Sequence, residues 1–317
     1  MATHHLDDAL TNCHGYLSRK LPPVLTVDSG DTVLFKTNNA GWNDRPPGMP
    51  MGQSLGRRPE GAGHCLSGPV FVRGAEPGDT LQIDVGAIEP SDWGTGGHRP
   101  GKAAISGILG GQPDDIAAQW GRHFTFDRAR GVYPVAPGIE VPAAPFMGIY
   151  TVAPDADEQP TAFPGPHGGN MDCKELRSGT TLYLPVFVPG ALFSTGDGHG
   201  TQGDGEVDGA AVETGMDRLE ITLTVRKDLP VERPRAETPT HLLFLAFGET
   251  LDDAAVVAVR DGMRYLSSAH GLSWDDAYNL CSIALDLRVT QVVDGPKGIH
   301  AMLPKSIFER PPSFAAG

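Results

Sequence analysis

The sequence lacks a long apolar run and closely spaced cysteines. No stretch reaches the length of about 18 apolar residues that a membrane-spanning helix requires, so we expect no membrane span. The four cysteines, at positions 13, 65, 173 and 281, form no CxxC pair, which favours reduced thiols. The N-terminal residues MATHHLDDAL show no basic region followed by an apolar core, the mark of a secretory signal. We therefore expect a cytoplasmic protein.

Basic residues are also scarce. The chain has 25 Lys and Arg against 39 Asp and Glu, which gives a formal net charge of −14. This charge repels polyanions, so nucleic acid and anionic membranes are not expected as partners. Hydrophobic residues make up 39% and charged residues 20%, which is ordinary for a globular protein and argues against disorder.

Several catalytic motifs are missing from the sequence. It contains no P-loop, no GxSxG elbow, no HExxH pair and no Rossmann glycine fingerprint after a strand. It also lacks a Ser-rich Gly-Gly-Ser stretch of the kind that carries Ser-Ser-Lys amidase chemistry. These absences count against nucleotide chemistry and against serine hydrolysis.

What the sequence does contain is β-strand patterning broken by turns. The 41 glycines and 28 prolines are spread along the chain and indicate turns between short strands. In the first two-thirds, Val33 and Phe35, and later Leu81, Ile83 and Val85, alternate with polar residues, which is typical of strands with one buried face. The segment from about 96 to 145 has no sustained period, and we expect an excursion there with a short strand or helix.

A weak internal repeat, Pro-Val-x-x-Val, a spacer and then Gly-Asp, ends at residues 29–31, 77–79 and 195–197. In the first two copies Gly-Asp leads straight into a predicted strand. In the third it leads into GHGTQGDGEVDG, residues 198–209, and the strand pattern resumes only at Leu219. A repeat that breaks its own pattern at one copy is a reasonable place to look for function.

The C-terminal part predicts helices and a hairpin. Thr250, with Asp253 three residues later, is typical of a helix N-cap, and that helix should end at Gly271. Ser273 caps a second helix, predicted from Trp274 to about Leu287. Two alternating runs around DGPKG then predict a hairpin. We therefore expect a mainly β fold, with a β core over residues 1–237 and an α+β subdomain over residues 238–317.

The segment with the strongest chemical signal is TGDGHGTQGDGEVDGAAVETG, residues 195–215. Asp197 and His199 are two residues apart, so on an extended backbone both side chains leave the same face. Asp204 and Glu206 repeat that spacing, and Glu213 follows. Carboxylates mixed with an imidazole suit Zn²⁺ or a similar transition metal better than an all-oxygen site does.

One histidine with carboxylates is an incomplete zinc set, so a further ligand is needed, and His64 is one candidate. His64 alone is a weak signal, because lone histidines are more often structural. The alternatives for residues 195–215 are a glycine-rich surface loop or a Ca²⁺-binding turn, although the spacing does not follow the EF-hand template. From the residues alone, a metal site and a solvated loop are equally good interpretations.

A second candidate segment is PHGGNMDC, residues 166–173. Asn170 can hydrogen-bond an amide or an oxyanion, and Asp172 can bind a metal or orient a histidine. The alternative is an Asx turn that enters the following strand. Cys173 can be weighed as a nucleophile, but a small buried hydrophobic residue is the favoured interpretation.

Taken together, these segments resemble the acetamidase/formamidase family. The similarity runs in order from near the N-terminus to near the C-terminus and rests on long, compositionally unusual stretches. The matching stretches are PPVLTVDSGDTV (22–33), HCLSGPVFVRGAEPGDTLQIDV (64–85), APFMGIYTVAP (144–154), HGGNMD (167–172), LYLPVFVPGALFSTGDGHGTQGDGE (182–206), Glu213, and YNLCSIALDLRVTQVVDGPKGIHAMLPKSIF (278–308).

The resemblance implies a jelly-roll-like β-sandwich with an α+β subdomain, and hydrolysis of short amides to a carboxylate and ammonia. It also implies a bound metal and a homodimer. The residues that match the family motifs are His64, Asn170, Asp172, Asp197, His199, Asp204, Glu206 and Glu213. Two positions depart from the pattern: Gly200 stands where alanine commonly follows the histidine, and Asp208 stands where a cysteine is common.

These observations give a mechanistic hypothesis. We expect Asp197, His199 and Glu213 to hold a divalent metal, zinc or alternatively calcium, with His64 or Asp172 completing or orienting the shell. We expect Glu206 or Asp204 to move the proton from water to the departing nitrogen, and Asn170 to hydrogen-bond the oxyanion. The rivals are a lactamase or longer-chain amidase on the same scaffold, and a non-catalytic β-sandwich with a structural Ca²⁺ site.

Overall fold

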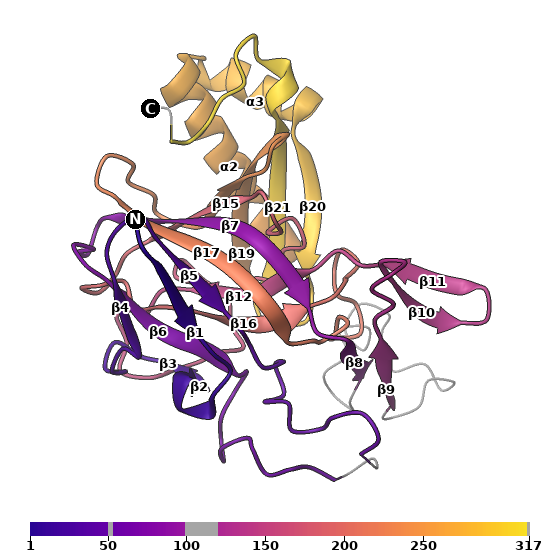
Figure 1. Ribbon diagram of the computed structural model, residues 1–317. Helices are drawn as coiled ribbons and strands as arrows, with labels where there is room; N and C mark the ends of the chain where they lie inside the picture. The colour runs from indigo at the N-terminus through magenta and orange to yellow at the C-terminus, as the bar shows by residue number, and fades with distance from the viewer. Residues whose placement is uncertain (50–52, 99–119, 316–317) are drawn as a thin grey trace.

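A computed structural model describes residues 1–49, 53–98 and 120–315 of the chain. Within these ranges the fold is mainly β, as predicted, with two α-helices near the C-terminus (Figure 1). The described strands form two large sheets and three small two-stranded ones.

The larger sheet has nine described strands, and only its outermost pair, β1 and β5, is parallel. In spatial order its strands are β1 (Thr3–Leu6), β5 (Asp31–Phe35), β17 (Met216–Arg226), β7 (Thr80–Pro90), β15 (Thr181–Pro185), β18 (Arg235–Glu237), β19 (His241–Gly248), β21 (Lys297–Pro304) and β20 (Asp286–Gln291). The alternation predicted around Val33 and around Ile83 therefore lies in two strands that both flank β17.

The second sheet has six described strands and carries the segments singled out for chemistry. Its path is β14 (Gly168–Asn170), β12 (Phe146–Thr151), β16 (Phe193–His199), β6 (Leu66–Val72) and β2 (Cys13–His14), and β4 (Leu25–Val27) pairs with β6 in parallel. The third Gly-Asp thus lies inside strand β16 instead of preceding a strand, and β17 begins at Met216, three residues before the expected Leu219.

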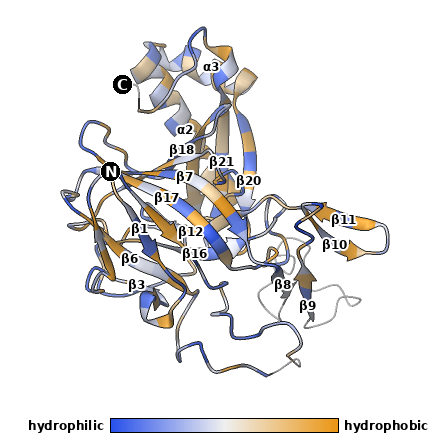
Figure 2. Ribbon diagram, in the orientation of Figure 1, coloured by the Kyte–Doolittle hydropathy of each residue, from blue (hydrophilic) through white to orange (hydrophobic). Residues whose placement is uncertain are grey.

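One hydrophobic core joins the two large sheets. Ile83 and Ile221 from the larger sheet and Met147 and Phe193 from the smaller one belong to the same cluster of fully buried side chains. Figure 2 shows the alternation of apolar and polar residues along these strands that allows each sheet to bury one face. This core holds the smaller sheet, and with it the ends of β12, β14 and β16, in a fixed position.

The C-terminal elements match their predicted boundaries closely. Helix α2 (Leu251–His270) begins with a capping box between Thr250 and Asp253 and ends at Gly271, whose φ is 68°. Helix α3 (Trp274–Ala284) ends before the expected Leu287, because residues 286–291 form strand β20 instead. The predicted hairpin is β20 paired with β21.

The larger sheet continues across the predicted boundary at residue 237. Strand β18, which ends at Glu237, pairs with β19, which begins at His241. The helices pack against β19 and β21 and form a second apolar cluster with them. It includes Phe244 of β19 and Leu266 of α2. The division into a β core and an α+β subdomain, and the jelly-roll order of the strands, stay predictions.

The region predicted as an excursion contains two hairpins that project from the sheets on the right of Figure 1. Strand β8 (Trp93–His98) pairs with β9 (Trp120–Thr125), and β10 (Val132–Ala136) pairs with β11 (Ile139–Pro142). Residues 99–119 of the excursion lie outside the described residues. A third small sheet pairs β3 (Tyr16–Leu17) with β13 (Gln159–Pro160).

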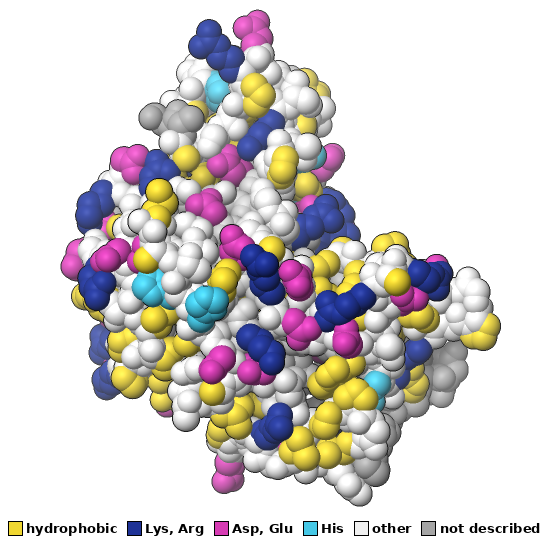
Figure 3. Space-filling view, in the orientation of Figure 1, with side chains coloured by type: hydrophobic (Ala, Val, Ile, Leu, Met, Phe, Trp, Pro, Cys, Tyr) yellow, Lys and Arg dark blue, Asp and Glu magenta, His cyan; other side chains and the backbone are white. Residues whose placement is uncertain are grey.

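The surface carries charges of both signs. Figure 3 shows acidic and basic side chains interspersed over one face, with small hydrophobic patches between them. Among the described residues, no helix has both the length and the apolar character needed to cross a membrane.

Candidate metal centre

His199, the last residue of β16, is the centre of the candidate site. It pairs in register with Phe146 of β12, and the Phe146 ring meets the imidazole edge-on at 5.0 Å between centroids. The imidazole is almost completely buried, and its Nε2 lies 3.6 Å from Oδ1 of Asp197. The two side chains therefore meet on one side of the strand, as the spacing of two predicted.

Glu213, which follows the glycine-rich residues 198–209, contacts the same histidine. Its backbone forms isolated bridges to His199 on one side and to Thr95 of β8 on the other. The carboxylate oxygen Oε2 of Glu213 lies 3.4 Å from Nε2 of His199. The backbone amide of Ala211 donates to the other oxygen, Oε1, at 2.9 Å, which fixes the orientation of the carboxylate.

Asp172 enters the site from the turn after β14. The backbone amides of Met171 and Asp172 both donate to the carbonyl of Gly148, at 3.1 and 3.2 Å, and so tie this turn to β12. Oδ1 of Asp172 lies 3.9 Å from Nε2 of His199. Asp172 is thus the third carboxylate within 4 Å of that nitrogen.

Gln202 connects His199 to the Asp172 turn. Its Nε2 donates to the backbone carbonyl of Asp172 at 3.0 Å, so its Oε1 is the atom that faces Nδ1 of His199, at 2.8 Å. Because an amide oxygen can only accept, Nδ1 must be the donor. The other ring nitrogen, Nε2, is then directed at the carboxylates.

Glu206 and Asp294 lie in two loops that backbone hydrogen bonds connect. The amide of Gly205 donates to the carbonyl of Thr290, and the amide of Val292 donates to the carbonyl of Gly205. These hydrogen bonds place the DGPKG turn of the C-terminal hairpin beside the glycine-rich segment. The carboxylate of Asp294 lies close enough to Asp172 there to raise the pKa of that carboxyl.

Three carboxylate residues of the site have left-handed backbone conformations. The φ angles are 49° at Asp172, 57° at Asp197 and 45° at Glu206. Residues with side chains rarely adopt this conformation, and its cost is of order 1–3 kcal/mol for each residue. Such strain persists where the surrounding structure imposes it, and it is concentrated at functional sites.

The electrostatics of the cluster indicate an excess of negative charge. Burial raises the pKa of Asp172 and of Glu206 well above the ordinary values, and neighbouring carboxylates raise both further. Burial also raises the pKa of Glu213 and of Asp294. Burial disfavours a charged His199, but the carboxylates of Glu213 and Asp197 outweigh it and raise the pKa of the imidazole.

Asp197 is the exception among the carboxylates. Burial acts to raise its pKa, but the imidazoles of His199 and His64 stabilise its charge and hold the pKa below the ordinary value. A single protonated imidazole cannot neutralise the whole cluster. A bound divalent cation would compensate the remaining charge and lower the other carboxyl pKa values.

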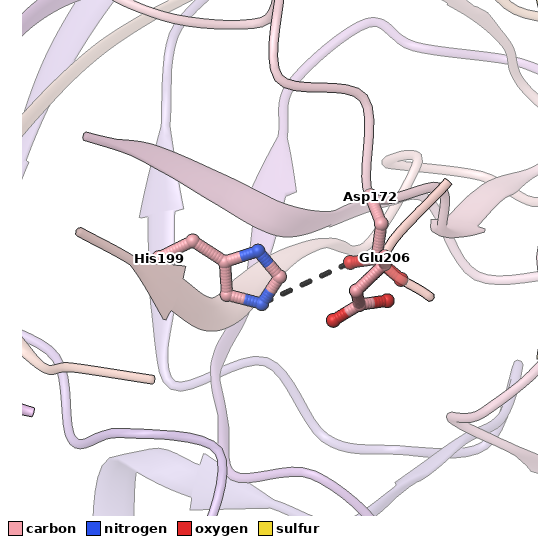
Figure 4. A group of neighbouring side chains, drawn as sticks. All are labelled: Asp172, His199 and Glu206. Carbon is pink, nitrogen blue, oxygen red and sulfur yellow. Dashed lines mark ion pairs between the residues drawn. The ribbon is translucent and has the colours of Figure 1, made fainter. Parts of the chain in front are cut away.

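The residues present fit a metal ion. Two groups can each offer three ligand atoms within 4.8 Å of one another: Asp197 with His199 and Glu213, and Asp172 with His199 and Glu206. The Nε2 of His199, the Oδ1 of Asp172 and the Oε2 of Glu213 are buried and have no hydrogen-bond partner among the described residues. In Figure 4 the carboxylates of Asp172 and Glu206 lie on the Nε2 side of the imidazole.

Gly148 leaves the space between these groups open. A Cβ atom at this position would lie 2.5 Å from Oδ1 of Asp172, 2.8 Å from Oδ2 of Asp197 and 3.0 Å from Cε1 of His199. Any side chain on residue 148 would therefore enter the cluster. This feature of β12 has no sequence signal beyond the glycine itself.

Two further predicted site residues, Asn170 and His64, lie outside the two ligand groups. Asn170 is buried in β14, and its Oδ1 has no partner. His64 is partly buried, its Nδ1 lies 3.0 Å from the hydroxyl of Thr161, and it belongs to neither ligand group. Its charge interacts with Asp197, which places it at the edge of the site.

Asp204 belongs to neither ligand group. Its carboxylate pairs with Lys174 at 3.1 Å and with the guanidinium of Arg288, whose Nε lies at 2.9 Å. Cys173 is fully buried in the main core, and burial raises the pKa of its thiol to about 12. This agrees with the interpretation of Cys173 as a small buried hydrophobic residue.

The sequence reasoning missed Gln202, Asp294 and Gly148. Gln202 was part of the glycine-rich segment, but a glutamine among stronger ligand types gave no separate signal. Asp294 was interpreted only as part of a hairpin turn. Its inclusion in a long stretch of family similarity was the one available hint.

The structure shows the surroundings of Gly200 and Asp208, the two residues that depart from the family pattern. A Cβ atom at Gly200 would lie 2.2 Å from the hydroxyl oxygen of Tyr133, so Tyr133 occupies the space that an alanine methyl group would need. Asp208 accepts a hydrogen bond from the amide of Ala210 at 3.2 Å, as in an Asx turn.

Comparison with known proteins identifies the family of this chain. The model of the Acetamidase/Formamidase family matches residues 3–161 and 156–310. A formamidase from Methylophilus methylotrophus is 27% identical over 315 residues, which cover 78% of this chain and 77% of that protein. An acetamidase from Mycolicibacterium smegmatis is 30% identical over 202 residues, which cover 45% of this chain and 49% of that protein.

Solved structures show the same similarity in three dimensions. The crystal structure of an acetamidase from Bacillus halodurans superposes with a TM-score of 0.86 at 30% identity, and it covers 98% of this chain and 100% of the other. A γ-lactamase from Delftia acidovorans superposes with a TM-score of 0.62 at 20% identity, over 98% of this chain and 95% of the other. At that identity the lactamase shows a related fold only.

Proposed function

The chain belongs to the acetamidase/formamidase family and is an amidase, and we propose that it hydrolyses short-chain amides such as formamide and acetamide in a metal-dependent reaction. The products are a carboxylate and ammonia. The observation that carries the metal dependence is the buried Nε2 of His199, which has no hydrogen-bond partner and faces Asp172, Asp197 and Glu213 at 3.4–3.9 Å.

We propose that Asp197, His199 and Glu213 hold the metal, and that Asp172 is the further ligand. This choice favours Asp172 over His64, because Asp172 shares a ligand group with His199 and His64 does not. A donor set with an imidazole nitrogen favours Zn²⁺, with Ca²⁺ as the alternative for its several carboxylates. When bound, such a metal polarises the amide carbonyl and lowers the pKa of water.

Glu206 is the residue that we propose moves the proton. Its side chain is buried on the Nε2 side of the imidazole, and burial raises the pKa of its carboxyl towards the range in which it can both take and release a proton (Figure 4). It takes a proton from the attacking water and delivers it to the departing nitrogen. Asp204, in contrast, already pairs with two cations, so Glu206 is the better of the two predicted candidates.

Asn170 is the proposed hydrogen-bond partner of the substrate. Its carboxamide is buried in the strand next to β12, with Oδ1 free of partners. Oδ1 can accept a hydrogen bond from the substrate amide N–H, and the Nδ2 group can donate to the tetrahedral oxyanion, a contact worth roughly 3 kcal/mol in other enzymes.

The test is the release of ammonia from a panel of amides. We expect turnover of formamide, acetamide and propionamide, and less with longer amides and with γ-lactams. Preference for a γ-lactam would favour the lactamase alternative, for which the lactamase similarity is fold-level support only. No turnover of any member of the panel would favour a binding protein with a structural Ca²⁺ site.

We further propose that the protein is a cytoplasmic homodimer. The dimer rests on the family resemblance, and the compartment on the four cysteines, which are all unpaired thiols in the structure. Light scattering coupled to size-exclusion chromatography measures the mass in solution. A mass of one chain, about 33.5 kDa, would contradict the dimer.

A further inference from the structure

A cavity of about 310 Å³ adjoins the candidate metal centre on the far side of Gln202. The residues that line it are Ala144, Lys174, Glu175, Arg177, Gln202 and Arg288. Gln202 is the shared wall, because the same side chain that lines the cavity is hydrogen-bonded to His199 and to the carbonyl of Asp172. The cavity and the metal centre are thus neighbouring spaces separated by one side chain.

The charges around this cavity are opposite in sign to those of the metal centre. Three of the lining residues are cations, whereas the chain as a whole has a net charge of −14. Lys174 and Arg288 share the carboxylate of Asp204. Arg288 also pairs with Glu175 at 3.0 Å. The three cations therefore face only two carboxylates, Asp204 and Glu175, so one positive charge remains without a counter-charge.

Arg177 carries most of that unbalanced charge. Within the described part of the chain its only ion-pair partner is Glu175, at 3.8 Å, which is too long for a hydrogen bond. Its side chain is 55% exposed, so the guanidinium is free to turn towards an anion in the cavity. A guanidinium presents a planar pair of N–H donors that matches the two oxygens of a carboxylate.

We propose that this cavity is a carboxylate-binding subsite that receives the acid product. The proposal rests on the proposed function, because amide hydrolysis produces a carboxylate inside a site that is lined by carboxylates. The cations beyond Gln202 attract that product. An uncharged amide has no such attraction and stays on the His199 side.

The ligand class follows from the size and charge of the cavity. Its volume equals that of about ten water molecules, which is ample for formate, acetate or propionate. Glu175 lies in the wall and opposes anions of higher charge, so a monocarboxylate is the expected ligand. Because Gln202 separates the two spaces, a carboxylate in the cavity and an amide at His199 can be bound at the same time.

The test measures acetate binding by calorimetry, with acetone as the uncharged, non-hydrolysable analogue of the same shape and sodium chloride at equal ionic strength as the blank. The full-length, metal-loaded protein is compared with Arg177→Gln. The matched control is Arg260→Gln, an exposed arginine on α2 that removes the same charge far from the cavity. We expect acetate to bind more tightly than acetone, and Arg177→Gln to weaken acetate binding by about tenfold, with Arg260→Gln unchanged.

Inhibition kinetics provide the second measurement. Acetate in the cavity should inhibit propionamide hydrolysis noncompetitively, and Arg177→Gln should remove that component. Equal acetate binding by Arg177→Gln and Arg260→Gln, or purely competitive inhibition in the wild type, would overturn the proposal. Calorimetry needs no turnover, so Arg177-dependent acetate binding in a protein that hydrolyses no amide would overturn the proposed function and leave the subsite standing.

Discussion

Nδ1 of His199 donates a hydrogen bond to Oε1 of Gln202 at 2.8 Å, and this single contact decides which ring nitrogen faces the carboxylates. Because the Gln202 amide is itself oriented by its bond to the Asp172 carbonyl, the tautomer of His199 is fixed from outside the cluster. Without a metal the carboxylates of Glu213 and Asp197 favour the protonated imidazole. Loss of the Nε2 proton would leave a lone pair that faces Asp172, Asp197 and Glu213. A lone pair aimed at anions suits a metal ligand.

The Gln202→Leu substitution should weaken metal binding. Leucine is one atom shorter than glutamine and offers no acceptor to Nδ1, and loss of such an orienting partner typically costs 10–100-fold in metal affinity. Competition with a fluorescent zinc chelator measures the affinity. The control is Thr201→Val at the adjacent position. Metal affinity in Gln202→Leu that equals that of the control would show that Gln202 does not orient the histidine.

The Glu206→Gln substitution should separate proton transfer from metal binding. An amide cannot take a proton from water, so we expect kcat to fall by roughly 10²–10⁴-fold. Metal content should stay close to that of the wild type if Asp197, His199 and Glu213 are the main ligands. The companion variant is Asp204→Asn, whose effect on kcat should be much smaller because that carboxylate pairs with Lys174 and Arg288. A reversed order of the two variants would assign the proton transfer to Asp204.

The Gly148→Ala substitution should close the space inside the cluster. Its methyl group would lie 2.5 Å from Oδ1 of Asp172 and 2.8 Å from Oδ2 of Asp197, so the two carboxylates must separate. We expect bound metal and ammonia release to be lost together. Gly203→Ala is the matched control, because a Cβ atom at Gly203 would meet no atom within 4 Å. Normal metal content in Gly148→Ala would place the ion elsewhere.

The contribution of His300 to stability should fall as the pH is lowered from 6.5 to 4. Burial lowers the pKa of His300 from 6.5 to about 4, so in this window the unfolded chain binds a proton that the folded chain does not. The contribution of His300 is fully present above pH 6.5, and about 3 kcal/mol of it is lost by pH 4. His14 and His167 carry the same shift for the same reason.

Urea unfolding of wild type and His300→Gln at pH 7 and pH 4.5 measures this effect. We expect the free energy of unfolding to depend less on pH in His300→Gln. The exposed His5 provides the control substitution, His5→Gln, which should keep the pH dependence of the wild type. Equal pH dependence in all three proteins would contradict a neutral buried His300.

Local patterns predicted much of the fold. The capping box at Thr250, the stop at Gly271 and the hairpin around DGPKG were predictable, because each depends on residues close together in the sequence. The spacing of Asp197 and His199 likewise placed both side chains on one side of a strand. The strand order could not be predicted in the same way, because pairings such as β7 with β15 join residues about a hundred positions apart.

The same contrast between local and long-range contacts applies to the candidate site. Clustered residues such as Glu206 and Glu213 gave a strong signal, whereas Asp294 reaches the cluster only through backbone hydrogen bonds between Gly205 and the β20–β21 hairpin. Asp204 had the same sequence signal as Glu206, but the cations that pair with it, Lys174 and Arg288, are contributed by other segments. Which carboxylates converge is therefore a property of the tertiary fold.

The most direct test of the metal-dependent mechanism measures metal content and ammonia release on the same protein preparation. The protein is depleted with a chelator, dialysed, and titrated with Zn²⁺ while acetamide hydrolysis is followed. We expect activity to be lost with the metal and to return in proportion to the zinc bound, and His199→Ala to recover neither. Full turnover by the metal-depleted wild type would contradict the metal-dependent mechanism.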